Sequence, residues 1–228
     1  MNYPELLNEL RASYEMHASS SDAVAMKAYM KNRFEFFGIK APVRRDIERK
    51  FLKSLGKPEQ ADIEVIARLA YQQPEREFQY FAIELARKYV KHLNASFIDH
   101  AGQMVTEKSW WDSVDNIASN IAGRLVQQHP GLLSVMDDWS KHENMWLQRT
   151  AILHQLRYKY QTDEQRLFCY CRQCSASKEF FLQKAIGWAL REYSKIKPDA
   201  VTSFVSNNSL APLSTREALK WLKNRQTA

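Results

Sequence analysis

Apolar residues recur at spacings of three and four along almost the whole chain. The segments EREFQYFAIELARKYV at 75–90 and QKAIGWALREY at 183–193 are examples. This spacing places the apolar side chains on one face of an α-helix, whereas a half-buried strand needs two-residue alternation, of which we find no convincing case. Short polar breaks separate these segments, among them FGIKAP, SLGKPEQ, QHPG and KIKPD. The pattern predicts roughly a dozen helices with tight connections.

Many short helices, six glycines and no long linker favour an all-α fold. We expect a HEAT-like α-solenoid of antiparallel helix pairs that forms one domain over residues 1–228. A compact all-α bundle is the alternative, because the repeat period is indistinct. Pro42 suits the first position of a helix, and Ser214 to Glu217 match a capping box. A solenoid offers a concave face that suits a duplex and needs no partner subunit, so a monomer is expected.

The charge is concentrated near the end of the chain. The formal net charge is +7, and residues 171–228 hold ten Lys or Arg against four Asp or Glu. A basic concave face suits a polyanionic partner such as nucleic acid, although lysine-rich solvated helices explain the same numbers. No apolar run is long enough to cross a bilayer, and MNYPELLNEL lacks the layout of a signal peptide. We therefore expect a cytoplasmic protein, in the cytosol and nucleoid of a bacterium if prokaryotic, without a membrane partner.

Three cysteines, Cys169, Cys171 and Cys174, lie within CYCRQC. Structural zinc sites use four ligands, and the nearest further candidate, His154, lies fifteen residues upstream of Cys169. On a helix the three thiols would point in different directions. We expect reduced, packed thiols and no metal, and the sequence assigns them no role.

The segment KSWWDSVDNIAS, residues 108–119, carries the first candidate chemistry. Ser109 and Asp112 have the spacing of a capping box. Asp115 falls to one side of the apolar stripe of this helix, in line with Trp111 and Ser119. A small side chain below and an indole above would leave a shallow hollow that contains a carboxylate. A surface aspartate beside packed tryptophans is the alternative.

Arg149 stands in the middle of an apolar stripe in NMWLQRTAILHQLRYKY, the helix predicted over residues 144–160. A guanidinium keeps its proton, so at this position it needs a carboxylate or a phosphate nearby. Asp115 could supply the first and a nucleic-acid backbone the second. A purely structural buried ion pair fits the pattern equally well.

Trp188 points away from the apolar stripe of its helix. Its neighbours on the same face are the cations Lys184, Arg191 and Lys195. An indole on a basic face suits contact with a phosphate backbone and its sugars or bases. Packing of Trp188 between repeats is the alternative.

Other residues are weaker candidates for DNA contact. Arg44 and Arg45 lie at a helix start, where the helix dipole also favours a phosphate. Tyr29 stands among apolar residues, which favours core packing, but it is kept as a candidate DNA contact. Phe180 and Phe181 are expected in the core.

Several strings together resemble one family, the HEAT-repeat DNA alkylation repair glycosylases known as the AlkD family. They are KSWWDSVD (108–115), WLQR (146–149), SKEFF with QKAIGWALREY (177–193), LAPLSTREALK (210–220), YMKNRFEFFGIKAP (29–42) and PEREFQ (74–79). The resemblance implies a helical solenoid that holds duplex DNA in a basic groove. It also implies hydrolysis of the N-glycosidic bond of cationic alkylpurines, such as N3-methyladenine and N7-methylguanine, without a metal or organic cofactor.

The resemblance also implies roles for individual residues. Asp115 would be the catalytic carboxylate, Trp111 and Trp188 the aromatic walls, and Arg149 would hold the cleft together or reach the backbone. A carboxylate beside C1′ would stabilise the positive charge that develops on the sugar as the base leaves. Because a charged alkylpurine is already a good leaving group, we expect activity to depend on the charge of the adduct. A non-catalytic HEAT-like scaffold that binds nucleic acid or protein remains the alternative.

Overall fold

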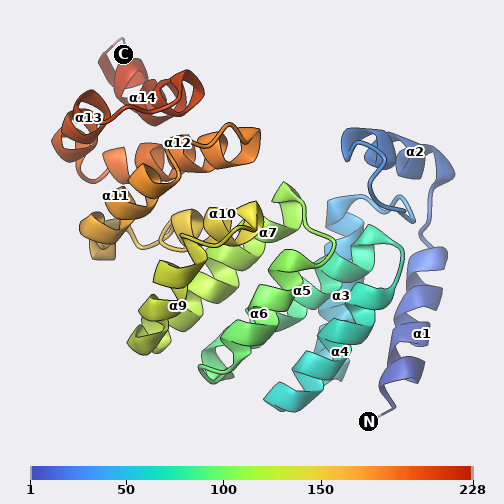
Figure 1. Ribbon diagram of the computed structural model, residues 1–228. Coiled ribbons are helices and arrows are strands. Elements are labelled where there is room, and N and C mark those ends of the chain that lie inside the picture. The colour runs from blue at the N-terminus through green and yellow to red at the C-terminus, as the bar shows by residue number, and fades with distance from the viewer. Residues whose placement is uncertain (1, 227–228) are drawn as a thin grey trace. The chain divides into compact units, whose positions relative to one another are not determined.

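The computed structural model describes residues 2–226, which are organised almost entirely as helices (Figure 1). Within this range the only β-type pairing is an isolated bridge between Glu35 and Glu75. The predicted all-α class is therefore confirmed. The helices form two compact units, residues 1–97 and 98–228. The expectation that residues 1–228 form one repeat domain stays a prediction.

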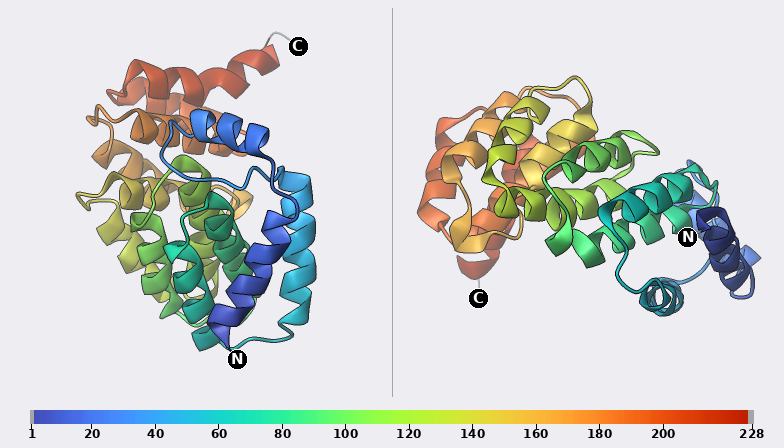
Figure 2. Two further views of the ribbon diagram at one scale, coloured as in Figure 1. Left: turned by 90° about the vertical axis from the view of Figure 1, so that its right-hand side faces the viewer. Right: turned by 90° about the horizontal axis from the view of Figure 1, so that it is seen from below.

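The first unit contains five α-helices. They are α1 (Tyr3–Glu15), α2 (Ser20–Tyr29), α3 (Ala41–Ser54), α4 (Gln60–Gln72) and α5 (Arg76–Tyr89). Helices α4 and α5 lie side by side, and both are drawn in teal to green in Figure 2. Helix α5 is buried along most of its length, with Phe78 and Phe81 fully enclosed. Pro42 is the second residue of α3, in the first turn, where its missing N–H has no intrahelical partner to lose.

The second unit begins within α6 (Phe97–Thr106) and contains the remaining helices. They are α7 (Trp111–Ile117), α8 (Gly123–Gln128), α9 (Leu133–Trp139), α10 (Met145–Leu153), α11 (Glu164–Gln173), α12 (Phe180–Ser194), α13 (Pro198–Asn207) and α14 (Pro212–Gln226). The apolar stripes predicted for α7 and α12 are buried. They comprise Val114, Ile117, Ala118, Ile121 and Leu125 in one segment and Leu182, Ile186, Ala189 and Tyr193 in the other.

A π-helical turn over Ala118–Ala122 joins α7 to α8 without a break in the chain. At Gly123 a Cβ atom would lie 2.1 Å from the backbone oxygen of His154, so only glycine permits this approach. The hydroxyl of Tyr158 donates a hydrogen bond of 2.5 Å to the Gly123 oxygen. The end of α10 and the turn after it are thereby held against the π-helical turn.

Helices α12 and α14 pack against each other in the C-terminal part of the second unit (Figure 1). A Cβ atom at Gly187 would lie 2.5 Å from the Cβ of Glu217, so glycine allows α14 to rest directly on α12. The Ser214 hydroxyl donates to the backbone oxygen of Gln183 at 2.9 Å. The capping box predicted for Ser214 and Glu217 is therefore wrong. Helix α14 begins two residues before Ser214, and both of these side chains bond to α12 instead.

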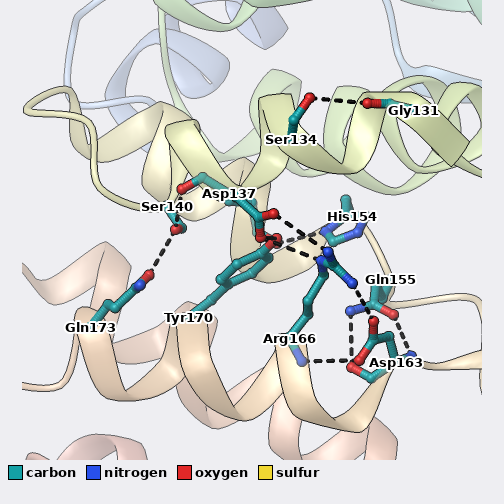
Figure 3. Close-up of polar contacts among 11 residues, drawn as sticks. Gly131, Ser134, Asp137, Ser140, His154, Gln155, Asp163, Arg166, Tyr170 and Gln173 are labelled. Atoms are coloured by element: carbon teal, nitrogen blue, oxygen red, sulfur yellow. Dashed lines mark hydrogen bonds and ion pairs between the residues drawn. The ribbon is translucent and has the colours of Figure 1, made fainter.

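A polar network connects α9 to α11 (Figure 3). Asp137 accepts a hydrogen bond of 2.7 Å from Tyr170 and forms an ion pair with Arg166 at 3.3 Å. Arg166 also pairs with Asp163 at 2.8 Å. The side chain of Gln155 bonds to both the N–H and the oxygen of Asp163, which closes the turn between α10 and α11. The network explains how polar side chains can lie inside this part of the unit.

The three cysteines lie on and just after α11. Cys171 and Cys174 are buried and Cys169 is half-buried, all as free thiols. Burial raises the pKa of Cys174 to about 11, and it raises the pKa of Cys171 as well. Cys171 and Cys174 are therefore packing residues that remain protonated at neutral pH. Across residues 2–226, no helix is long and apolar enough to cross a membrane.

His154 generates a prediction about stability and pH. Its ring is fully buried, Nδ1 lies 2.7 Å from the Ala151 oxygen, and burial lowers its pKa to about 4. Between pH 6.5 and pH 4 the unfolded chain takes up a proton at this residue while the native ring stays neutral. The free energy of unfolding should therefore fall by about 2 kcal/mol from pH 7.5 to pH 5 through this residue alone.

Urea unfolding followed by circular dichroism at the two pH values would measure this loss. We expect His154→Gln to lose stability less steeply on acidification than the wild-type protein. The exposed His142 offers a matched control, and His142→Gln should retain the wild-type slope. Equal slopes in the wild-type protein and His154→Gln would contradict a neutral buried ring.

Candidate functional site

A pocket of about 370 Å³ opens between α7, α10, α12 and α14 in the second unit. Its lining includes six residues that the sequence analysis singled out for catalysis or DNA contact. The full lining is Trp111, Asp115, Arg149, Phe180, Phe181, Lys184, Trp188, Arg191 and Glu217. Residues up to 106 positions apart in the chain therefore meet in one hollow.

Asp115 and Arg149 form a two-pronged ion pair at the base of this pocket. Arg149 Nε lies 2.6 Å from Asp115 Oδ1, and Nη2 lies 2.8 Å from Oδ2. The third donor, Nη1, bonds to the backbone oxygen of Phe181. The side chains of Arg149 and Asp115 are only 5% and 16% exposed. The guanidinium thus joins α7, α10 and α12, and fixes the plane of the carboxylate.

Burial and the ion pair act on the acidity of Asp115 in opposite directions. Burial raises the pKa of Asp115, and the nearby charge of Asp112 adds to the rise, while the hydrogen bonds and charge of Arg149 lower it. The balance is a raised pKa. The two hydrogen bonds from Arg149 favour the ionised form of the carboxylate against this rise. In a mostly apolar hollow the charge of an ionised carboxylate is weakly screened.

Three aromatic rings pack against one another beside the ion pair. The ring centroid of Trp110 lies 5.9 Å from that of Trp146 and 4.9 Å from that of Phe181. Trp146 and Phe181 are 5.1 Å apart. Trp110 is buried and precedes α7, and Ser109 donates to the Val105 oxygen. The capping box predicted for Ser109 and Asp112 is therefore wrong, because the helix starts two residues after Ser109 and its serine is used elsewhere.

The pocket has aromatic walls. Trp111, the first residue of α7, and Trp188, in the middle of α12, are both half-buried and line it. Phe180 is 56% exposed, so its expected place in the core is wrong. Its ring lies against that of Phe181, with centroids 5.4 Å apart, and it borders the pocket entrance. The exposure of Phe180 was not predicted from the sequence, because adjacent phenylalanines at a helix start face different directions.

Lys184 and Arg191 border the pocket beside Trp188, and both are paired. Lys184 Nζ and Arg191 Nη1 each lie 3.0 Å from a different oxygen of Glu217. Lys195, the residue that follows α12, pairs with Glu192 at 2.7 Å and does not line this pocket. The sequence pattern identified the cations but missed Glu217, because its spacing from Ser214 matched a helix cap.

A second, larger hollow of about 860 Å³ lies at the other end of α10 and α12. Its lining carries four basic residues, Arg124, Arg157, Lys159 and Lys195. The helix predicted over residues 144–160 already ends at Leu153. The chain after Leu153 therefore leaves the helix axis. Tyr160, the last residue of that predicted helix, is 84% exposed as a result. The sequence pattern singled out Lys195 but not Arg124, Arg157 or Lys159, because these three belong to segments far apart in the chain.

The remaining candidates lie in the first unit. Arg44 is largely buried and pairs at 2.6 Å with Glu48, whose side chain is almost fully buried, while Arg45 is exposed. Tyr29 is 67% exposed, so the expectation of core packing is wrong. DNA contact by Tyr29, Arg44 and Arg45 stays a prediction. Within residues 2–226, no group of three or more His, Cys, Asp or Glu side chains is placed to hold a metal ion.

Comparison with known proteins identifies one family. The family model described as "DNA alkylation repair enzyme" matches residues 10–222. A predicted DNA alkylation repair enzyme from Enterococcus faecalis has a similar structure, with 35% sequence identity and a TM-score of 0.86 over 90% of this chain and 97% of that one. A comparison with curated proteins found no match.

Two solved structures from Streptococcus mutans share the fold at lower identity. The protein smu.31 is 19% identical, with a TM-score of 0.62 over 79% of this chain and 96% of its own. AlkD2 is also 19% identical, with a TM-score of 0.60 over 76% of this chain and 85% of its own. These two matches bear on the helical fold alone.

Replacing Arg149 tests the electrostatic account of the site. In Arg149→Gln the pKa of Asp115 should rise further, because burial remains and the opposing cation is gone. The free energy of unfolding should fall by about 3 to 5 kcal/mol, as expected when one partner of a buried ion pair is removed. Carboxyl-carbon NMR titration would measure the pKa, and urea unfolding the stability.

Arg166→Gln is the matched control, since Arg166 also pairs with carboxylates in the second unit but lies outside the pocket. It should leave the pKa of Asp115 unchanged. A pKa for Asp115 that is the same in Arg149→Gln and in the wild-type protein would refute the account.

Proposed function

Because the chain belongs to the family of DNA alkylation repair enzymes, as its resemblance to AlkD predicted, we propose that it is a monofunctional DNA glycosylase. It hydrolyses the N-glycosidic bond of cationic alkylated purines, such as N3-methyladenine and N7-methylguanine, in duplex DNA. The observation that carries this proposal is the carboxylate of Asp115 in an aromatic-walled pocket, with its plane fixed by two hydrogen bonds from Arg149. We further propose that it acts as a cytoplasmic monomer, without a metal or organic cofactor.

Asp115 is suited to the charge that develops in this reaction. Departure of the base leaves positive charge at C1′ and the ring oxygen of the sugar, and a fixed carboxylate stabilises that charge without rearranging. Each carboxylate oxygen accepts one hydrogen bond from Arg149 and keeps a further lone pair. The carboxylate can therefore also orient the attacking water and receive its proton.

Trp111 and Trp188 would act on the same charge through the faces of their rings. A cation next to an indole face gains about 1 to 2 kcal/mol when water is excluded. This stabilisation grows as the sugar becomes positive, so it favours the transition state over the ground state. A shallow pocket with both indoles aimed at the sugar does not need to enclose the departing base.

Strand cleavage through a Schiff base is not part of the proposal. That chemistry needs a neutral lysine amine beside C1′. Lys184 is the lysine that lines the pocket among the described residues, and its ammonium is held in an ion pair with Glu217. An ammonium in such a pair is a donor and not a nucleophile.

Asp115→Asn provides the direct test. The amide keeps the shape of the side chain and one acceptor for Arg149, but removes the negative charge. Release of free base from an N7-methylguanine duplex should fall by at least about a hundredfold, as for loss of a group that stabilises transition-state charge. Affinity for a duplex with an abasic site should stay equal or improve, because a carboxylate near the phosphates is gone.

Ser113→Ala is a suitable control, since Ser113 lies two residues away on α7, is buried, donates to the Trp110 oxygen and does not line the pocket. It should keep base release close to the wild-type rate. If the wild-type protein binds the duplex but releases no base, the chain is a nucleic-acid-binding scaffold and the proposal fails.

The second hollow suits the DNA backbone beyond the lesion. Lys195 directly follows α12 and lies seven residues after Trp188, which is about 10 Å along a helix. Arg157 and Lys159, in the turn after α10, stand on the same hollow. We propose that they contact backbone phosphates adjoining the damaged nucleotide.

Replacing Arg157 and Lys159 by glutamine together should weaken DNA binding mainly at low salt. The slope of log affinity against log salt should decrease by about two, one for each lost phosphate contact. Base release in a single turnover at saturating protein should be unaffected. Filter binding at several salt concentrations measures the slope. Lys141→Gln, at an exposed position, is the control. An unchanged slope in the double variant would exclude these residues from the backbone contact.

A further inference from the structure

Glu217 is a second carboxylate at the pocket, and the proposed reaction assigns it no role. It lies in the second turn of α14, and its side chain is 14% exposed. One oxygen accepts from Lys184 and the other from Arg191, both at 3.0 Å. These two cations stand on either side of Trp188 along α12. Glu217 therefore ties together the charges that surround one aromatic wall.

The position of this carboxylate is set by the backbone. A Cβ atom at Gly187 would lie 2.5 Å from the Cβ of Glu217, so the glycine is needed for α14 to approach α12 this closely. The Ser214 hydroxyl anchors the first turn of α14 to the Gln183 oxygen. Because the two helices touch at this point, Glu217 has little freedom to move away from Lys184 and Arg191. The hydrogen bond from Lys184 lowers the pKa of Glu217, so the carboxylate stays ionised.

The proposed reaction makes two opposite demands on this part of the pocket. Cations beside Trp188 attract a phosphate backbone, which strengthens binding of any DNA. The same cations repel a sugar or base that carries positive charge, which opposes the chemistry. Lys184, Arg191 and Glu217 together carry one net positive charge, whereas the two cations alone would carry two.

We propose that Glu217 is a specificity-determining positioning residue, which holds Lys184 and Arg191 and offsets their charge so that the pocket favours a cationic sugar over a neutral one. This inference rests on the proposed glycosylase function. Glu217 acts through its two partners and through its field, and it does not contact the reacting atoms. Without it, the pocket would bind DNA more tightly and select for positive charge less well.

A purely structural role for Glu217 leads to a different expectation. If the ion pairs of Glu217 only hold α12 and α14 together, breaking them would loosen the pocket and lower its affinity for every ligand alike. The charge-balancing role changes the ratio between a cationic and a neutral ligand of the same shape. The discriminating quantity is therefore a ratio of dissociation constants and not a single affinity.

The experiment uses two duplexes that differ in one group opposite a normal base. One contains a tetrahydrofuran abasic analogue, which is neutral, and the other a pyrrolidine analogue, whose ring nitrogen is protonated and resembles the charged sugar. Dissociation constants are measured for the full chain by filter binding at fixed salt. The preference is the constant for the neutral duplex divided by that for the cationic duplex.

Glu217→Gln should lower this preference by about fivefold to tenfold, while its affinity for the neutral duplex stays equal or increases. Glu192→Gln is the matched control, because Glu192 lies on α12 and also pairs with a lysine, Lys195, but does not line the pocket. It removes the same charge and should leave the preference unchanged. Thermal unfolding of each variant verifies that the helices remain packed.

Lys184→Gln gives a change of opposite sign that a folding defect cannot imitate. It removes a cation and leaves Glu217 in place, so both duplexes should bind more weakly while the preference for the cationic one increases. A wild-type preference near one would overturn the proposed glycosylase function together with this inference. A wild-type preference that Glu217→Gln retains would overturn the role of Glu217 alone.

Discussion

The guanidinium of Arg149 is the contact on which the site depends. Its three donor positions reach both oxygens of Asp115 and the backbone of Phe181, so one planar group fixes three helices relative to one another. A guanidinium buried in this way cannot lose its proton, and it would be costly without these acceptors. The carboxylate therefore has the same orientation before any ligand arrives, which is the arrangement that electrostatic stabilisation of a developing charge requires.

Close helix contacts place the other groups around this pair. Gly123 lets the backbone after α10 rest against the π-helical turn that follows α7, and Gly187 lets α14 rest on α12. A side chain at either position would push the helices apart and shift the pocket walls. Close packing of the helix backbones thus sets the shape of the pocket, while charged side chains on those helices supply its charges. This division explains how an apolar unit can present two carboxylates, three cations and two indoles in one small space.

Much of this could be predicted from the sequence, for physical reasons. Apolar spacing identified the helices, because each helix buries one face, and Asp115, Arg149 and Trp188 were noticed because each departs from that rule. Helix caps were not predictable at Ser109 and Ser214, since a serine hydroxyl near a helix start can equally well bond to another helix. Glu217 was missed for the same reason. Its partners come from α12, and contacts between distant segments leave no local pattern.

The aromatic cluster has an optical consequence. Of the six tryptophans in the chain, Trp111 and Trp188 line the pocket, and Trp110 and Trp146 pack behind it around Phe181. Indole emission depends on the polarity and charge near the ring, so four of the six indoles are placed to respond to changes at the site. Occupancy of the pocket is consequently coupled to a native spectroscopic signal, and binding and release can be followed in real time without an attached dye.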